Sequence, residues 1–258
     1  MIGLAFIRTA LFAETLEMST DINAVIPMAA LRSSRDGKLP VLYLLHGLGG
    51  DHTEWTRQAS VERYAEDKGI ALILPRADRS YYMDMKQGAA YYTYLSEELP
   101  AIAKSLFPIS DRREDTFIAG LSMGGYGAFK LALRQPERFA AAASLSGSLD
   151  IVHRLSEPEV FRNREEERMF GSVVEVQGSD DDLLALAGKV AAAGNQPQLY
   201  QCCGTEDFLY EGNRNFLKHA EKVGLRVTYD EEPGGHEWSY WDRNIQKVFD
   251  WLPVDKNR

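Results

Sequence analysis

Residues Thr116 to Leu133 read TFIAGLSMGGYGAFKLAL, with apolar residues at both ends and a glycine-rich middle around Ser122. The glycines are Gly120, Gly124, Gly125 and Gly127. Because glycine weakens both helices and strands, such a cluster indicates a backbone that larger side chains would obstruct. The stretch predicts a buried strand, a sharp turn at the serine and then a helix.

Residues 120–124 fit the G-x-S-x-G pattern of a nucleophile elbow, a strained strand-to-helix turn that exposes a serine hydroxyl. The pattern alone occurs in many unrelated proteins, so the flanking strand and helix give it its weight. Gly120 and Gly124 would make room for the turn. We expect Gly125 and Gly127 to let the helix approach the sheet and direct its N-terminus at an oxyanion.

Apolar runs like the one before the serine recur along the chain and alternate with helical patterns. The expected strands are residues 41–45, 70–75, 116–120, 140–146, 198–203 and 225–231. The expected helices are residues 53–68, 91–107, 125–134, 213–223 and 241–252. Continuous apolar runs are typical of parallel strands buried on both faces, and their alternation with helices indicates a doubly wound α/β fold.

Two segments depart from this alternation. Residues 11–27 alternate in polarity around a turn expected at residues 19–21, which predicts an antiparallel hairpin or two edge strands. Residues 148–197 are polar and broken, with helices expected at 161–170 and 180–194. We interpret residues 1–258 as a single domain in which 148–197 form a candidate cap. Helices packed on the flank of the sheet are the alternative.

Charge and hydropathy narrow the set of partners. The net charge is −9 and no basic cluster stands out, so neither nucleic acid nor an anionic membrane is expected as a partner. No run of eighteen apolar residues predicts a membrane span. The apolar N-terminus lacks a basic leading segment and is interrupted by Arg8, unlike a signal peptide, so a cytoplasmic location is expected. The sequence leaves a homo-oligomer open.

Neither a metal nor another cofactor is expected. His236 and Glu237 begin an H-E-x-x-H pattern, but Tyr240 stands where the second histidine belongs, and no phosphate-binding loop pattern is present. Cys202 and Cys203 are adjacent and make a poor disulfide pair, so we expect two reduced, buried thiols in a strand. A redox switch is the alternative and has no other support.

A serine hydroxyl needs a base, usually a histidine that a carboxylate orients. In a fold with a nucleophile elbow, the order along the chain is serine, acid and then histidine. His236 lies in a glycine-rich loop after strand 225–231, whereas His219 lies within an expected helix. Asp207 and its rival Glu206 both follow strand 198–203.

The oxyanion formed during acyl transfer needs N–H donors from the residue after the nucleophile and from a loop after an early strand. Met123 supplies the first donor. The loop HGLGG at residues 46–50 follows strand 41–45, and Leu48 is the expected second donor. Trp55 and Trp238 lie near these loops in sequence, and we weigh substrate contact and core packing evenly for both.

Several segments together resemble the tributyrin esterases of the esterase D branch of the α/β-hydrolases. They are HGLGGDHTEW (46–55), YYTYLSEELP (91–100), AGLSMGGYGAFKLAL (119–133), CGTEDFLYE (203–211) and GGHEWSYW (234–241). The resemblance spans residues 41–252 and is weakest at 148–197. It implies an α/β-hydrolase fold with a mostly parallel central sheet, helices on both faces and a small cap-like excursion.

The resemblance also implies a serine carboxylesterase that hydrolyses short-chain acyl esters, such as tributyrin or small acetyl esters, through an acyl-enzyme. The nucleophile corresponds to Ser122, the acid to Asp207 and the base to His236. S-formylglutathione hydrolases of the same branch typically carry histidines where Leu121 and Tyr126 stand here. Such a thioesterase, an acyltransferase of the branch and, from another class, a non-catalytic binding protein are the alternatives.

Overall fold

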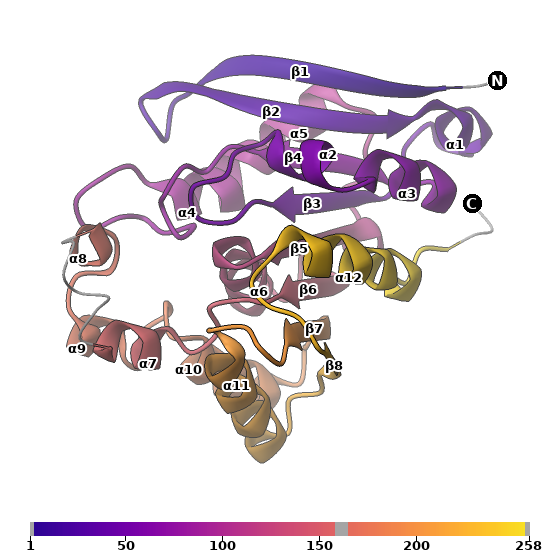
Figure 1. Ribbon diagram of the computed structural model, residues 1–258. Helices are drawn as coiled ribbons and strands as arrows, with labels where there is room; N and C mark the ends of the chain where they lie inside the picture. The colour runs from indigo at the N-terminus through magenta and orange to yellow at the C-terminus, as the bar shows by residue number, and fades with distance from the viewer. Residues whose placement is uncertain (1–2, 158–164, 256–258) are drawn as a thin grey trace.

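The computed structural model describes residues 3–157 and 165–255, within which eight strands form one sheet (Figure 1). The strand order is β1-β2-β4-β3-β5-β6-β7-β8. Strands β1 (Leu4–Ala13), β2 (Met18–Pro27) and β4 (Ala71–Pro75) pair antiparallel in that order. The other pairs are parallel and join β4 to β3 (Val41–Leu45), β5 (Thr116–Leu121), β6 (Ala141–Leu145), β7 (Gln198–Gly204) and β8 (Thr228–Glu232).

Helices cover both faces of the sheet, because successive side chains of a strand point to opposite faces. One face packs with α2 (Glu54–Gln58), α3 (Val61–Lys68) and α12 (Trp238–Trp251). The other packs with α5 (Leu99–Leu106), α6 (Met123–Arg134), α10 (Leu183–Ala193) and α11 (Tyr210–Val223). Strands β3, β4, β5 and β6 are buried along their whole length, which explains their continuous apolar sequences.

The predicted α/β class is confirmed, and five of the six expected strands lie within one residue of their expected bounds. The strand expected at 225–231 is β8, which begins three residues later at Thr228, because the N–H of Leu225 still donates to the Ala220 carbonyl at the end of α11. The N-terminal hairpin is confirmed as well, but the turn expected at residues 19–21 is wrong. The chain turns at residues 14–17, where Glu17 adopts a φ of 55°. Residues 19–21 instead pair with β1, because that strand begins at Leu4 and extends the ladder.

Two expected helices are interrupted. Residues 53–68 divide into α2 and α3 because Ala59 is extended, with φ −138° and ψ 161°. Residues 91–107 divide into α4 (Tyr91–Thr93), a π-helical turn η1 (Tyr94–Glu98) and α5. Pro100 has no N–H for the carbonyl of Ser96, and the guanidinium of Arg138 donates to that carbonyl instead. Four short helices among the described residues were not predicted: α1 (Met28–Ser33), the 3₁₀ turn η2 (Arg113–Asp115), α7 (Ile151–Ser156) and α9 (Val173–Val176).

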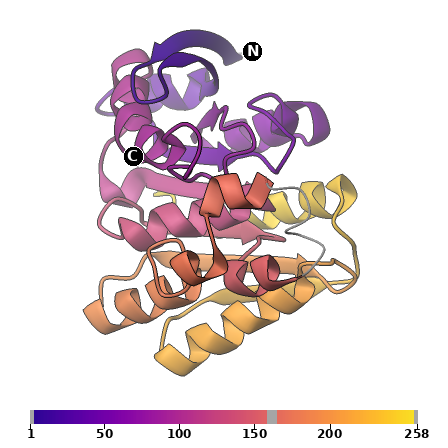
Figure 2. The ribbon, with the colours of Figure 1, turned by 90° about the vertical axis from the view of Figure 1, so that its left-hand side faces the viewer.

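The segment after β6 contains α7 (Ile151–Ser156), α8 (Glu165–Phe170), α9 (Val173–Val176) and α10. The helix predicted at 161–170 lies partly outside the described residues, and α8 covers its second half. Asp182 caps α10, because its carboxylate accepts hydrogen bonds from two backbone N–H groups. Figure 2 faces the carboxyl ends of the parallel strands, and the salmon-coloured α8 lies in front of them.

Contacts from α6 and from the loop after β4 fix the position of this segment. The ammonium of Lys130, buried on α6, lies 2.6 Å from an Asp181 carboxylate oxygen, and the Tyr126 hydroxyl donates to the Asp181 carbonyl at 2.8 Å. Arg79 forms an ion pair with Glu165 at the start of α8. The backbone N–H of Gln87 donates to the carbonyl of Arg168 at 2.9 Å.

Candidate active site

Ser122 stands between β5 and α6, with φ 54° and ψ −119°. A positive φ is strained for a residue with a β-carbon, and neighbouring contacts must hold it. The Ser122 N–H donates to the carbonyl of Leu145 at 2.9 Å, while the Ser122 carbonyl accepts from the N–H of Tyr126 at 3.1 Å. The first bond ties the turn to β6 and the second ties it to α6, so the predicted sharp turn is confirmed.

The glycines around the serine allow close backbone contacts. A β-carbon on Gly120 would lie 2.4 Å from the backbone of Gly124, and one on Gly124 would lie 2.5 Å from the carbonyl oxygen of Leu45. One on Gly125 would lie 2.6 Å from Ser144 on β6, so that glycine lets α6 approach the sheet. The same role was expected of Gly127, and that expectation is wrong. A β-carbon added at Gly127 would meet the ring of Tyr82 in the loop after β4, and not the sheet.

A continuous hydrogen-bonded chain joins Ser122, His236 and Asp207. The Nε2 atom of His236 lies 2.9 Å from Ser122 Oγ, and its Nδ1 atom lies 2.8 Å from Asp207 Oδ2. A carboxylate only accepts hydrogen bonds, so Nδ1 carries the proton and Nε2 accepts from the serine hydroxyl. The structure thus brings together side chains from the ends of β5, β7 and β8 that are far apart in sequence.

The acid and the histidine differ in their exposure to solvent. The Asp207 side chain is fully buried and His236 keeps 18% of its side-chain surface exposed. Asp207 Oδ1 also accepts the backbone N–H of Leu209 at 2.8 Å, which fixes the carboxylate toward the imidazole. Its sequence rival, Glu206, is exposed, and His219 lies within α11. Sequence position alone did not separate Asp207 from Glu206, whereas the geometry does.

The loop at residues 46–50 passes beside the serine, since a β-carbon on Gly47 would lie 3.6 Å from Ser122 Cβ. His46, which is buried, holds this loop. Its Nε2 accepts the N–H of Ala77 at 3.0 Å, and its Nδ1 lies 2.8 Å from the Gly47 carbonyl and therefore donates to it. Burial lowers the pKa of His46, so the ring is neutral and fixed in one tautomer.

Two aromatic side chains also anchor the loop. The indole N–H of Trp55 donates to the carbonyl of Leu45 at 2.9 Å, and the hydroxyl of Tyr82 donates to the carbonyl of His46 at 2.8 Å. Trp55 follows the loop itself and Tyr82 follows β4, so the loop is held from two sides. Leu48 lies at its exposed tip, next to Gly49 with a φ of 84°.

Met123 is the first residue of α6 and is fully buried. The first N–H groups of a helix have no acceptor within the helix and carry the positive end of its dipole. An oxyanion beside Ser122 would therefore meet the start of α6 on one side and the loop at residues 46–50 on the other.

The two tryptophans differ in their surroundings. Trp55 is 1% exposed, and its ring packs edge-on against Trp238 with ring centres 5.2 Å apart. The burial favours core packing for Trp55 over substrate contact, because no free surface remains for a ligand. Trp238 is half-buried and also packs edge-on against Trp241, which in turn contacts the imidazole of His236 with ring centres 4.8 Å apart.

Phe208, which the sequence motifs did not single out, also packs against His236. Its ring centre is 4.6 Å from that of the imidazole, and 62% of the residue is exposed. Its place directly after Asp207 in the segment CGTEDFLYE was the available signal, but sequence alone does not show that the side chain turns toward the histidine.

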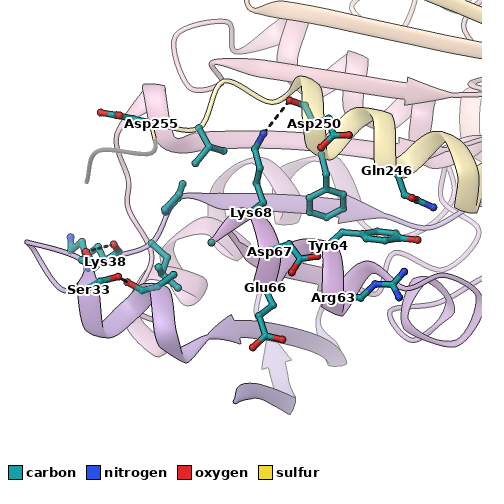
Figure 3. Close-up of a pocket in the computed structure, with 17 residues that line it drawn as sticks. Ser33, Lys38, Arg63, Tyr64, Glu66, Asp67, Lys68, Gln246, Asp250 and Asp255 are labelled. Carbon is teal, nitrogen blue, oxygen red and sulfur yellow. Dashed lines mark hydrogen bonds between the residues drawn. The ribbon is translucent and has the colours of Figure 1, made fainter. Parts of the chain in front are cut away.

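A wide groove of about 750 Å³ lies away from this site (Figure 3). It is lined by residues at the amino ends of β3 and β4, such as Pro40 and Gly69, and by the C-terminal end of α12. Charged side chains of both signs surround it, including Lys68, whose ammonium donates to the carbonyl of Asp250. The serine and histidine stand at the opposite, carboxyl ends of the strands, so the groove is not part of the active site.

The described residues also show the state of the two cysteines and whether any group of side chains could bind a metal or any helix could cross a membrane. Cys202 and Cys203 are buried, free thiols in β7, as predicted, and burial raises the pKa of Cys202 to about 12. Within residues 3–157 and 165–255, no group of three or more His, Cys, Asp or Glu residues is arranged to hold a metal ion. In the same ranges, no helix combines the length and apolarity that crossing a membrane requires.

On this mostly parallel sheet, a serine in a strained turn bonds to a histidine, which in turn bonds to a buried carboxylate. This arrangement defines the class of serine hydrolases with the α/β-hydrolase fold. The chain belongs to the esterase family described as "Putative esterase", whose model matches residues 14–252. It is a carboxylic ester hydrolase, and the alternative of a non-catalytic binding protein is not supported.

Similar proteins agree with this assignment. An acetyl esterase of Caldicellulosiruptor saccharolyticus is 32% identical, over 96% of this chain and 98% of its own. The structure of FphF, a fluorophosphonate-binding serine hydrolase of Staphylococcus aureus with substrate bound, matches with a TM-score of 0.89 and 33% identity over 98% and 99% of the two chains. An S-formylglutathione hydrolase of the same organism matches with a TM-score of 0.86 and 33% identity over 97% and 99%.

Proposed function

We propose that this esterase hydrolyses short-chain acyl esters, with small acetyl esters as its best substrates, through an acyl-enzyme on Ser122. The observation that carries the proposal is the bonded chain from Ser122 Oγ through His236 to Asp207, with distances of 2.9 and 2.8 Å. The similarity to an acetyl esterase along nearly the whole chain supports the acyl group.

In acylation, Ser122 Oγ attacks the ester carbonyl carbon while His236 Nε2 accepts the hydroxyl proton. The buried carboxylate of Asp207 stabilises the imidazolium that forms and holds Nδ1 in place. As the carbon–oxygen bond to the alcohol breaks, His236 returns the proton to the departing oxygen. Water then attacks the acyl-enzyme with the same histidine as base, which releases the acid and restores Ser122.

The negative charge on the carbonyl oxygen is stabilised by the backbone N–H groups of Leu48 and Met123. Met123 contributes through the N-terminus of α6, and the loop with Leu48 is pre-positioned by bonds to the carbonyls of Leu45 and His46. Such fixed donors need no reorganisation as charge develops. Losing one donor in comparable sites costs on the order of 3 kcal/mol in the barrier.

A cluster of aromatic rings beside Met123 supports a short acyl chain. Tyr81 packs edge-on against Phe170 of α8 and against Tyr126 of α6, with ring centres 5.1 and 5.7 Å apart. The backbone N–H of Tyr81 donates to the sulfur of Met123 at 3.3 Å, which places this cluster next to the nucleophile. We infer that the cluster limits the space for the acyl chain and that 148–197, which supplies Phe170, acts as a cap.

A second candidate activity is hydrolysis of an S-formylglutathione thioester, because proteins similar to this chain carry that name. Leu121 and Tyr126 occupy the positions where that group typically has histidines. Here Leu121 is buried beside Gly47, and Tyr126 is buried with its hydroxyl on the Asp181 carbonyl. This packing favours the carboxylesterase, and a thioester with a formyl group remains the test substrate for the alternative.

We also propose a cytoplasmic site of action with a small-molecule ester as the partner. The two free, buried thiols of Cys202 and Cys203 are compatible with a reducing compartment. The net charge of −9 disfavours nucleic acid and anionic membranes as partners.

A single substrate panel tests the proposal. Specificity constants, kcat/KM, are measured with p-nitrophenyl esters from acetate to octanoate and with S-formylglutathione, for the wild type and for Ser122→Ala. We expect the highest value for acetate, a decline with chain length, and a loss of roughly 10⁴-fold or more in kcat for the variant. A preference for octanoate would contradict the short acyl site. A preference for S-formylglutathione over every ester would establish the second candidate.

A further inference from the structure

The alcohol released in acylation must lie next to His236, because Nε2 of that residue gives it a proton. Nε2 lies 2.9 Å from Ser122 Oγ, and the leaving oxygen must come within hydrogen-bond distance of the same atom. Groups attached to that oxygen therefore extend over the surface around the imidazole. The side chains that border the imidazole determine which alcohols fit.

Two aromatic rings border the imidazole, and they differ in exposure. Trp241 packs edge-on against it and is 6% exposed, so this side is filled by the core. Phe208 lies 4.6 Å from it between ring centres, tilted by 52°, and is 62% exposed. Phe208 is thus the side that offers an apolar surface to a ligand at the histidine.

The backbone around Phe208 holds the ring in this place. The N–H of Leu209 donates to the Asp207 carboxylate at 2.8 Å, and the N–H of Tyr210 donates to the Asp207 carbonyl at 2.9 Å. Leu209 is buried, so the turn directs consecutive side chains to opposite sides and leaves Phe208 outside. Because Asp207 itself forms this turn, the Phe208 ring keeps a fixed position relative to Asp207 and His236.

The surroundings of Phe208 favour a neutral ligand. The guanidinium carbon of Arg154 lies 5.3 Å from the centre of the Phe208 ring, but Arg154 also forms an ion pair with Glu157 at 2.5 Å. The cation is thereby compensated by a carboxylate. The loop at residues 46–50, here called the oxyanion loop, carries Leu48. Among the described residues, Leu48 and Phe208 are the exposed large apolar side chains on the loops of the proposed site.

We propose that Phe208 is a specificity-determining residue of the alcohol subsite, and that it favours esters of neutral alcohols with a flat aromatic ring, such as benzyl esters. This inference rests on the proposed esterase function of Ser122 and His236. The alcohol ring stacks against the exposed ring of Phe208 while its oxygen receives the proton from Nε2. By reversal of the same step, an aromatic alcohol in this subsite accepts the acyl group from Ser122 in place of water.

In that transfer, the alcohol oxygen forms a bond to the acyl carbon as the bond from that carbon to Ser122 Oγ breaks. The alcohol proton passes to His236 Nε2 and then to Ser122 Oγ. No electrons are exchanged with another reagent, so the reaction is balanced by the ester and the alcohol alone. Phe208 stabilises only the bound alcohol and takes no part in proton transfer.

The test compares benzyl acetate with methyl acetate, which form the same acetyl-enzyme. For Phe208→Ala we expect kcat/KM to fall about 2- to 10-fold for benzyl acetate, the range for loss of an aromatic pair, and to change little for methyl acetate. Phe208→Tyr keeps the ring and should restore the benzyl preference. Phe12→Ala is the matched control, since Phe12 is 63% exposed but lies on β1 at the far edge of the sheet.

Acyl transfer gives an independent measurement. The acetyl-enzyme formed from p-nitrophenyl acetate is offered benzyl alcohol or methanol, and the ratio of ester to acetate produced is measured. Phe208→Ala should lower this ratio for benzyl alcohol only. Equal losses for both alcohols, or no loss for either, would overturn the proposal. A wild type that forms no acetyl-enzyme would instead refute the proposed function.

Discussion

Replacing Gly124 with alanine tests how tightly the elbow and the oxyanion loop are packed together. The added β-carbon would lie 2.5 Å from the carbonyl oxygen of Leu45 and 2.7 Å from that of His46. Ordinary contact begins at 3.4 Å, so the nearer contact must open by about 0.9 Å (3.4 less 2.5). Neither neighbour can rotate away because both are backbone atoms. The loop with Leu48 must therefore move relative to Ser122.

We expect two measurable effects of Gly124→Ala. A displacement of about 1 Å in a catalytic group costs on the order of 10²-fold in rate, so kcat for p-nitrophenyl acetate should fall by about that factor. Overpacking costs about 1–3 kcal/mol, and each kcal/mol lowers Tm by about 2–4 °C for a chain of this size. The assay is run well below Tm, with circular dichroism to confirm that the variant is folded. Gly124→Val should abolish activity.

The matched control is Gly188→Ala on α10, where an added β-carbon meets no atom within 4 Å. Alanine is favoured over glycine within a helix by up to about 1 kcal/mol, so this variant should keep full activity and equal or higher stability. A Gly124→Ala protein with kcat within about threefold of the wild type would refute the reasoning. It would show that the oxyanion loop moves without loss of function.

Three further substitutions test other contacts. Asp207→Asn should lower kcat by on the order of 10⁴-fold, because the amide no longer fixes the histidine tautomer. Glu206→Gln, at the exposed neighbouring position, should leave kcat unchanged, and equal losses in the two variants would contradict the assignment of Asp207 as the acid. Trp55→Phe removes the hydrogen bond from the indole to the Leu45 carbonyl. The variant should therefore lose about 1–3 kcal/mol of stability and have a lower kcat with little change in KM. A rise in KM alone would indicate that Trp55 contacts the substrate instead. Burial lowers the pKa of Lys130 to about 8 from 10.5, so between these pH values the unfolded chain binds more protons than the folded chain. The free energy of unfolding of the wild type, relative to that of Lys130→Met, should therefore rise with pH by up to about 1.4 kcal/mol per pH unit, as measured by urea unfolding. A difference between the two proteins that does not change with pH would contradict the lowered pKa.

Much of the fold could be predicted because the central strands are buried on both faces. Val41–Leu45 and Thr116–Leu121 appear as unbroken apolar runs, and the glycines around Ser122 mark a close backbone contact that any larger side chain would block. Motif order then located His236, and the family resemblance selected Asp207 from two adjacent carboxylates. These features are local in sequence, so they are visible without the tertiary structure.

The remaining features depend on contacts between distant segments. The position of the hairpin turn at residues 14–17 depends on pairing between β2 and β1, which begins at Leu4. The helix break at Ala59 occurs without a proline or glycine, so the local sequence does not indicate it. The ion pairs from Lys130 to Asp181 and from Arg79 to Glu165 join residues 51 and 86 positions apart. Phe208 could be found only once the turn after β7 showed its side chain beside the imidazole.

The most direct test of the central claim is to identify the residue that carries the covalent intermediate. The protein is treated with a fluorophosphonate probe, digested, and examined by tandem mass spectrometry. The account predicts one adduct, on Ser122, that is absent in Ser122→Ala. In His236→Ala the adduct should form on the order of 10²-fold more slowly or slower still, because the serine hydroxyl then lacks its base. An adduct on another serine, or undiminished labelling of Ser122→Ala, would contradict it.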